Sequence, residues 1–328
     1  MILRAAGLGS LPGTDLPAAL RMLSEATPEV VAVPELPARG AGADMVGRTA
    51  AMLSGLGVDL QPAGWRLTDS AGIDQRRARA RLRRDFDELE EHLQGHAGIV
   101  KFALAGPWTM ASLVERPRGD KVLADHGARR ELAQSLAAGA DDLLAELRRR
   151  LPEVTWWVQV DEPMLAPVLA GKVATASSFS KHRAVDAAQV AELLDLFSGL
   201  AEVSGLHWCG RPEVEVMARV GFSAVSVDTG SLVSSDLDTL AQWLEGGRQV
   251  WWGAVPTAVV DQLGSLDEAA ARLYRLFEVL GLDSEVLLGG LVTPACGLGT
   301  WSPLPAQEVL RQAARVAEIT TERVADGR

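Results

Sequence analysis

The chain has 328 residues, of which 48% are hydrophobic, and its net charge at pH 7 is −11. This acidic charge disfavours a general nucleic-acid-binding protein, because such proteins need a basic surface. No apolar run reaches the roughly 18 residues of a membrane span, and the N-terminal residues MILRAAGLGS lack the long apolar core of a signal peptide. We therefore expect a cytoplasmic protein without a membrane or nucleic-acid partner, whose two cysteines are free thiols or metal ligands rather than a disulfide scaffold.

Short apolar runs alternate with longer helical patterns along the chain. Helical periodicity covers residues 72–95, 187–203 and 266–282, and residues 108–150 hold at least two helices. Most of the apolar runs have few polar residues, which is typical of strands buried on both faces of a parallel sheet. The expected strands are residues 3–10, 30–36, 99–106, 155–162, 204–210, 223–229, 249–255 and 286–293.

Eight strands that alternate with helices predict an α/β fold, a single (β/α)8 TIM barrel with helical insertions that spans residues 1–328. An open doubly wound sheet is the alternative, although no G-x-G-x-x-G follows the first strand. In a barrel the chemistry lies at the C-terminal ends of the strands, and the chemically unusual residues of this chain fall there. They are Ser10, Glu35, Gly106, Pro107, Asp161, Glu162, Pro163, His207, Cys209, Asp228 and Cys296.

The segment LHWCG places a histidine and a cysteine on alternate positions of a strand, so that His207 and Cys209 point to the same side. Cys296 lies in the loop TPACGLGT after the last strand, and a closed barrel brings that loop to the same mouth. Imidazole and thiolate are the ligands that zinc prefers, and a carboxylate can complete the set, for which Asp228 is the natural candidate. The sequence therefore predicts a zinc site, although a buried cysteine can also be a small core residue.

One basic cluster, DQRRARARLRRDF at residues 74–86, stands out in an acidic chain. The ordinary interpretation is the solvated face of a helix. The functional interpretation is a contact for an acidic substrate tail or an acidic partner.

Five motifs together resemble the cobalamin-independent methionine synthase family, and specifically its C-terminal catalytic barrel. The motifs are GLGSLPGT, LAGPWTM, VQVDEPML, LHWCG and VTPACGLGT. They follow one another in the family's order, each at an expected strand end, and the resemblance extends from about residue 6 to about residue 302. It implies a TIM barrel of the uroporphyrinogen-decarboxylase-like kind.

The resemblance also implies a metal site. His207, Cys209 and Cys296 match the family's zinc ligands. Asp228 stands where the family usually has a glutamate ligand, at a slightly shorter spacing from Cys209.

For the substrate, the resemblance implies a site for homocysteine. Gly9, Ser10 and Glu35 match positions that hold the amino-acid part of this substrate. Asp161 matches the carboxylate that binds its amino group, and a carboxylate is the partner that an ammonium group needs. Glu35 and Asp161 are therefore also the candidate catalytic carboxylates.

The sequence departs from the family's pattern in three ways. We expect no counterpart of the N-terminal barrel that helps hold folate in the family's long enzymes. Where the family usually shows an Asp-x-His segment that can act as an acid, residues 253–260 read GAVPTAVV, with Pro256 and Thr257. Trp108 stands where a smaller residue is common, and it either stacks on a flat donor or fills space.

The leading hypothesis is a zinc-dependent methyltransferase that transfers a methyl group to the thiol of homocysteine to give methionine. A methyl group that leaves tetrahydrofolate requires protonation of the nitrogen that it leaves. Because the histidine is missing, the donor stays open between a methylfolate, a methylcorrinoid on a partner protein and a small methylated compound. Two alternatives are a uroporphyrinogen-decarboxylase-like lyase, which needs arginines at the mouth and no zinc, and a non-catalytic barrel that binds zinc or a thiol. Arg211 is the main arginine near a strand end.

Overall fold

Eight parallel strands form one sheet in the computed structural model, which describes residues 2–326 of the chain. The order in the sheet is β1-β10-β9-β8-β7-β6-β5-β2, so β1 and β2 lie at its two edges. The strands are β1 (Arg4–Ala5), β2 (Val30–Ala32), β5 (Ile99–Ala105), β6 (Thr155–Asp161), β7 (Val203–His207), β8 (Ala224–Asp228), β9 (Gln249–Val255) and β10 (Leu291–Pro294).

The two edges meet just beyond the ends of β1 and β2. Ser10 and Glu35 form a parallel bridge there, in which Leu11 N–H donates to the Glu35 carbonyl (2.8 Å) and Glu35 N–H donates to the Gly9 carbonyl (2.9 Å). This bridge closes the sheet into a barrel. The (β/α)8 fold expected from the sequence is confirmed, and the open doubly wound sheet is excluded.

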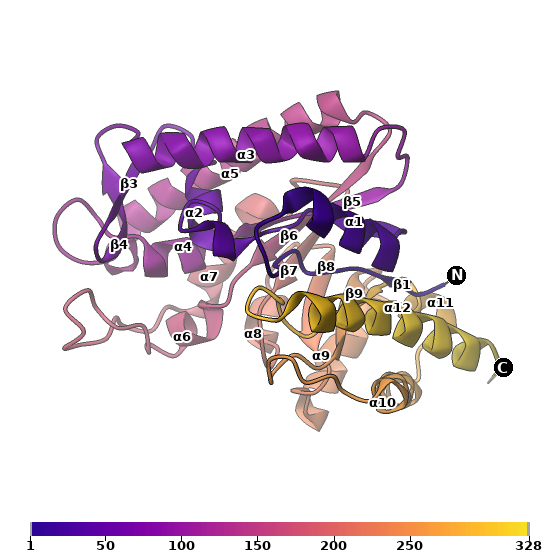
Figure 1. Ribbon diagram of the computed structural model, residues 1–328. Helices are drawn as coiled ribbons and strands as arrows, with labels where there is room; N and C mark the ends of the chain where they lie inside the picture. Colours follow the sequence, from indigo (N-terminus) through magenta and orange to yellow (C-terminus); the bar gives the residue numbers. More distant parts are fainter. Residues whose placement is uncertain (1, 327–328) are drawn as a thin grey trace.

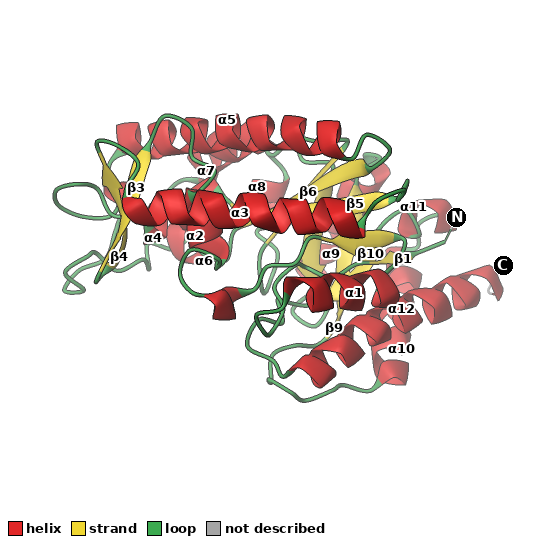
Figure 2. Ribbon diagram, turned by 45° about the horizontal axis from the view of Figure 1, so that its top comes forward, coloured by secondary structure: helices red, strands yellow, loops and turns green. Residues whose placement is uncertain are grey.

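Helices surround the strands (Figures 1 and 2). They are α1 (Leu16–Ala26), α2 (Met45–Ala50), α3 (Ile73–His92), α4 (Pro107–Leu113), α5 (His126–Arg150), α6 (Leu165–Leu169), α7 (Ala187–Leu194), α8 (Val214–Met217), α9 (Ser234–Glu245), α10 (Leu266–Leu280), α11 (Ser284–Leu287) and α12 (Pro303–Asp326), with 3₁₀ helices at Pro37–Arg39, Val122–Ala124 and Asp195–Phe197. Among the described residues, no helix combines the length and the apolar character that crossing a membrane requires.

The structure differs from the expected elements in three places. Residues 284–287 form helix α11, so the last strand begins at Leu291 instead of residue 286. The helix expected at 187–203 ends at Leu194, because a 3₁₀ turn and then β7 follow. A β-hairpin of β3 (Gly57–Gln61) and β4 (Gly64–Thr68) was not expected, although Gly64, with φ of +129°, marks its turn.

The barrel interior is filled by side chains from alternate strand positions. The layer nearest the strand starts is apolar, and its two largest members, Trp157 and Trp251, stack with ring centroids 6.2 Å apart. A Cβ atom at Gly205 would lie 2.3 Å from the Trp251 ring, so the ring requires glycine there. The layer consists of Ala6, Val30, Ile99, Trp157, Val203, Ala224, Trp251 and Leu291.

The inward positions further along the strands are polar. Lys101, Gln159 and Ser226 lie two residues beyond members of the apolar layer, and Asp161 and His207 follow near the strand ends. Figure 1 shows the described chain ends at one end of the barrel and α2, α4, α6 and the β3–β4 hairpin at the other. The polar positions therefore face the end that carries the long loops.

Candidate active site

A cavity of about 230 Å³ lies at the C-terminal ends of the strands. It is lined by Leu8, Gly9, Ser10, Glu35, Met45, Ala103, Gln159, Asp161, Pro163, His207, Cys209, Cys296 and Gly297. Eight of the residues singled out in the sequence thus meet in one place: Gly9, Ser10, Glu35, Asp161, Pro163, His207, Cys209 and Cys296. They come from five different strands or the loops that follow them, as the barrel topology requires.

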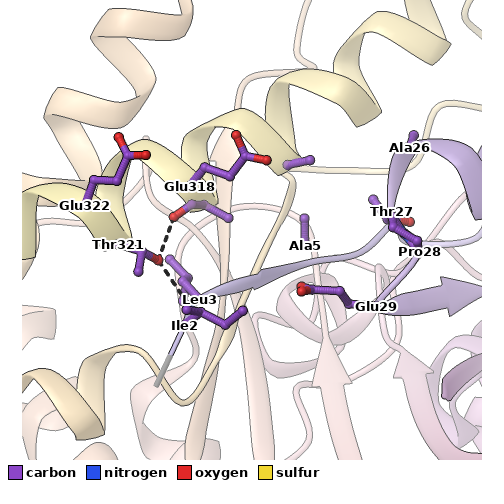
Figure 3. A pocket seen from close by; sticks show the side chains of 12 residues that line it. Ile2, Leu3, Ala5, Ala26, Thr27, Pro28, Glu29, Glu318, Thr321 and Glu322 are labelled. Carbon is purple, nitrogen blue, oxygen red and sulfur yellow. Dashed lines mark hydrogen bonds between the residues drawn. The ribbon is translucent and has the colours of Figure 1, made fainter. Parts of the chain in front are cut away.

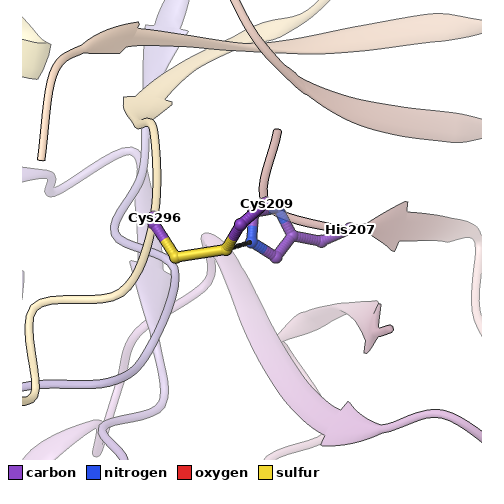
Figure 4. A group of neighbouring side chains, drawn as sticks. All are labelled: His207, Cys209 and Cys296. Atoms are coloured by element: carbon purple, nitrogen blue, oxygen red, sulfur yellow. Dashed lines mark hydrogen bonds between the residues drawn. A yellow bond between two sulfur atoms is a disulfide. The ribbon is translucent and has the colours of Figure 1, made fainter. Parts of the chain in front are cut away.

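His207, Cys209 and Cys296 form a group whose ligand atoms all lie within 4.8 Å of one another (Figure 4). His207 is the last residue of β7, Cys209 follows it, and Cys296 lies in the loop after β10. Three such donors could hold a metal ion. Cys209 is exposed and Cys296 is half-buried, so a fourth ligand can approach from the mouth.

The two cysteines are joined by a disulfide in this structure (Figure 4). This corrects the expectation of free thiols. The loops after β7 and β10 bring the two Cα atoms to 5.8 Å, within the range of roughly 4.4 to 6.8 Å that a disulfide spans. The same proximity lets the reduced pair bind one ion, so disulfide formation and metal binding exclude each other.

The His207 ring is held in an orientation that suits a metal ligand. Its Nδ1 lies 2.9 Å from Ser226 Oγ, and its Nε2 lies 3.8 Å from Cys209 Sγ. When Nδ1–H donates to Ser226, the lone pair of Nε2 faces the sulfurs, an arrangement typical of metal-binding histidines. Burial, reinforced by the positive charge of Lys101, lowers the pKa of His207 to about 3, so the imidazole is neutral. Sequence analysis did not identify Ser226.

Asp228 does not belong to this group of donors among the described residues. Its carboxylate accepts a hydrogen bond from Gly230 N–H (2.8 Å), and Arg272 is the nearby positive charge. Its position at the end of β8 places it on the same rim as His207, on the neighbouring strand. A role as a metal ligand stays a prediction.

Asp161 is oriented by a relay of buried side chains. Gln159 Nε2–H donates to Asp161 Oδ1 (2.7 Å) and to the Leu8 carbonyl (3.0 Å), and Lys101 Nζ donates to Gln159 Oε1. Burial raises the pKa of Asp161, and burial lowers the pKa of Lys101. Sequence analysis missed Lys101 and Gln159, although Gln159 lies two positions before Asp161 and so on the same face of β6.

Glu35 is a buried carboxyl group on the cavity wall, where it is hydrogen-bonded to the Ser10 side chain. Burial raises its pKa to about 7, against the lowering effect of Arg48. The loop that carries Cys296 docks beside it, because Leu298 N–H donates to the Ser10 carbonyl (2.9 Å). A Cβ atom at Gly299 would lie 2.6 Å from Ser10 Oγ, so this close approach requires glycine.

Trp108 lies outside the cavity lining. Its ring is 1% exposed, its Nε1–H donates to the Val190 carbonyl (3.0 Å), and Arg129 stacks over it. The structure therefore gives Trp108 a packing position between α4 and α7.

Glu162 follows Asp161 and is fully buried, and it stabilises the C-terminal end of the barrel. Its carboxylate accepts hydrogen bonds from Trp108 N–H (2.8 Å) and Thr109 N–H (2.7 Å), and from the Thr109 hydroxyl (2.6 Å). It thus ties the end of β6 to the first turn of α4. Burial raises the pKa of Glu162 to about 7.

Comparison with known proteins adds independent findings. The model of the family described as "Cobalamin-independent synthase, Catalytic domain" matches residues 87–319, more than half of the chain. The structure of a B12-independent methionine synthase from Shewanella sp. W3-18-1, in complex with selenomethionine, aligns with a TM-score of 0.69 and 16% identity. The alignment covers 99% of this chain and 100% of that one. At this identity it shows the fold alone.

A Bacillus subtilis mannanase aligns with a TM-score of only 0.36 at 11% identity over 92% of this chain and 85% of that one, which carries no argument. No curated protein sequence matches the chain. The family match agrees with the family that the five sequence motifs resemble. The chain belongs to the cobalamin-independent synthase family, in which it matches the catalytic domain.

Proposed function

We propose that the chain is a zinc-dependent methyltransferase that transfers a methyl group to the thiol of homocysteine and forms methionine. The observation that carries the proposal is the position of His207, Cys209 and Cys296 on the wall of the same cavity as Glu35 and Asp161. The three metal-binding residues can position a thiol, and the carboxylates can bind an ammonium group in the same small cavity. These two groups are the two ends of homocysteine.

The reduced donor set suits zinc. Two thiolates are soft ligands and a neutral imidazole is a borderline one, a combination that zinc binds well. Three protein ligands leave a position for a substrate, as in catalytic zinc sites. Bound there, zinc would keep a substrate thiol ionised at neutral pH. We propose that the fourth position belongs to the substrate sulfur, or to Asp228 when no substrate is bound.

The residues of the cavity bind and orient the amino acid. Asp161, held by Gln159, offers a carboxylate to the substrate ammonium. Burial raises the pKa of Asp161, and the arrival of a positive charge favours the ionised form, so the substrate itself completes this ion pair. Ser10 and the backbone at Gly9 form the neighbouring wall.

When the methyl group is transferred from a nitrogen atom of the donor, that nitrogen is the leaving group and needs a proton. Pro256 and Thr257 follow β9 where the family usually has a histidine. Glu35 is the candidate acid in this chain, because burial raises its pKa to about 7 and it lines the cavity. A methylfolate donor therefore relies on Glu35, whereas a methylcorrinoid donor does not need this proton.

The two alternatives find less support. A uroporphyrinogen-decarboxylase-like lyase needs arginines at the mouth, but no arginine is among the described residues that line the cavity. Arg211 instead pairs with the buried Asp236 (2.8 Å). A barrel that binds without turnover has the same ligands, and only an assay separates it from an enzyme.

The test is metal content together with methyl transfer on the reduced protein. We expect about one zinc per chain and formation of methionine from homocysteine with methyltetrahydrofolate or methylcobalamin as the donor. Zinc with no methionine from either donor would favour the binding barrel. Failure to bind zinc after full reduction and reconstitution would reject the proposal.

A further inference from the structure

Lys101 places an ionisable amine in the interior of the barrel. It lies on β5 and points inward, two positions after Ile99 of the apolar layer. Only 1% of the residue is exposed, and burial lowers the pKa of its ammonium group. A buried lysine costs free energy unless it has partners. Trp157 and Trp251 fill the neighbouring layer without this cost, so packing alone does not explain a lysine at this position.

The Lys101 side chain contacts Gln159 and Trp251. Its Nζ donates a hydrogen bond to Gln159 Oε1, and it lies 5.4 Å from the centre of the Trp251 ring. The negative charge of Asp161 opposes the effect of burial on the pKa of Lys101, although no hydrogen bond or ion pair joins the two side chains directly among the described residues. Gln159 therefore stands between the lysine and the carboxylate.

The Gln159 amide has two different ends, an oxygen that accepts and a nitrogen that donates. The oxygen accepts from Lys101, and the nitrogen donates to Asp161 Oδ1 (2.7 Å) and to the Leu8 carbonyl (3.0 Å). In the reverse orientation the amide oxygen would face two other oxygens. Lys101 thus fixes which end of the amide faces Asp161, and it does so in either charge state, because a neutral amine also donates.

Gln159 connects two walls of the active cavity. Leu8 precedes Gly9 and Ser10 on one wall, and Asp161 stands on the other. The hydrogen bond from Gln159 lowers the pKa of Asp161 and so opposes the effect of burial. The ionised carboxylate is the form that pairs with an ammonium group. The orientation of one buried amide therefore bears on how well the cavity binds an amino acid.

We propose that Lys101 is a positioning residue for substrate binding, which fixes the Gln159 amide so that Asp161 stays an acceptor for the ammonium group of an amino acid. The inference rests on the proposed function, which places the ammonium group of homocysteine at Asp161. Lys101 is not among the residues that line the cavity, so it acts on the ligand only through Gln159 and Asp161.

Isothermal titration calorimetry with L-methionine, on the reduced full chain supplied with zinc, tests this role. Lys101→Met keeps the length of the side chain but removes the donor. The matched control is Thr293→Val, because Thr293 is buried, points inward two positions after Leu291 of the apolar layer, and has no hydrogen-bond partner for Oγ1 within residues 2–326. We expect methionine to bind about tenfold more weakly to Lys101→Met and within twofold of wild type to Thr293→Val.

A double-mutant cycle tests whether Lys101 acts through the amide. Gln159→Met alone should weaken methionine binding about tenfold or more, and Lys101→Met should add less than twofold in that background. In the methyl transfer assay, Lys101→Met should raise KM for homocysteine about tenfold and leave kcat within about threefold of wild type, because Lys101 does not touch the reacting atoms. A general disturbance of the barrel would lower kcat and zinc content as well.

Unchanged methionine affinity in Lys101→Met, or an equally large loss from Lys101→Met in the Gln159→Met background, would overturn the inference. If Lys101→Met does not fold, the double variant replaces it, because exchanging both polar partners for apolar side chains leaves no buried group unpaired. A further loss of more than twofold in the double variant relative to Gln159→Met would then overturn the inference. Failure of the wild type to bind either L-methionine or homocysteine would instead reject the proposed function.

Discussion

A cavity lies at each end of the barrel, and the two differ in both size and chemistry. The cavity where the strands begin has a volume of about 360 Å³, and the cavity where they end about 230 Å³. The larger one is bounded by β1, the end of α1 and α12 (Figure 3). Its walls are mostly apolar, and its carboxylates, Glu29, Glu318 and Glu322, are exposed.

The smaller cavity is surrounded by ionisable groups that the fold has removed from water. Glu35 and His207 are buried and Asp161 is half-buried, and removal from water shifts the pKa of each toward the value that favours its neutral form. Such groups cost stability, so a protein retains them where they act on a ligand. Ionisable side chains that are removed from water therefore identify the functional end of this barrel better than cavity volume does.

The largest expected effect comes from breaking the metal group at the functional end. Cys296→Ser removes one of three donors, so we expect zinc to fall from about one per chain to near zero and methyl transfer to fall on the order of 10²-fold or more. Glu29→Gln at the opposite end is the control and should leave both unchanged. Metal analysis by mass spectrometry under reducing conditions measures the first effect, and full zinc occupancy in Cys296→Ser would contradict the assignment.

Sequence analysis predicted the barrel because its signal is repeated. Eight apolar runs separated by helical periodicity leave few other folds, and all eight strands are present. The β3–β4 hairpin was missed because it lies outside the barrel and its strands are short and mixed in polarity. The start of β10 was misplaced because VLLGG is apolar enough for a strand, whereas Ser284 to Leu287 form a helical turn.

For the site, sequence analysis found the residues with unusual chemistry and missed those that support them. His207, Cys209 and Cys296 are rare residue types at strand ends, so they stand out. Ser226 and Gln159 are common residue types, and only the pairing of β7 with β8 shows that Ser226 contacts His207. The period of two within a strand was the available signal for Gln159.

The next effect in size concerns substrate binding by Asp161. Asp161→Asn keeps an oxygen that can accept from Gln159 but removes the charge, so we expect kcat/KM for homocysteine to fall about 10- to 100-fold, mainly through KM. Because burial opposes the charged form, the thermal stability of the variant should equal or exceed that of wild type. Steady-state kinetics measure the effect, with Glu322→Gln as the control. An unchanged KM would remove Asp161 from the substrate site.

A smaller effect, on stability, tests whether the carboxyl groups of the functional end are strained by burial. Burial raises the pKa of Glu162 to about 7 from an ordinary 4.5, so the folded protein binds this proton more tightly than the unfolded chain does. The protonated Glu162 therefore contributes to the free energy of unfolding fully below pH 4.5. This contribution, about 1 to 3 kcal/mol, is lost as the pH rises toward 7. Urea unfolding at several pH values should show a shallower decline between pH 5 and 7 in Glu162→Gln, and no change in the exposed control Glu29→Gln. Equal slopes in wild type and Glu162→Gln would show that the three hydrogen bonds to Glu162 offset its burial.

The smallest effect on activity and stability is expected for a substitution in the larger cavity, where the strands begin. A small effect there is what the contrast between the two cavities predicts. Ala314 lies on α12 in the wall of the larger cavity, so Ala314→Leu adds apolar volume where the cavity has room. Leucine is a good helix former and buries additional apolar surface, so we expect a change in unfolding free energy within about 1 kcal/mol and methyl transfer within twofold of wild type. Thermal unfolding and the methyl transfer assay measure the two quantities. A large loss of activity with unchanged stability and metal content would mean that this cavity also has a function, and the contrast between the two ends of the barrel would no longer hold.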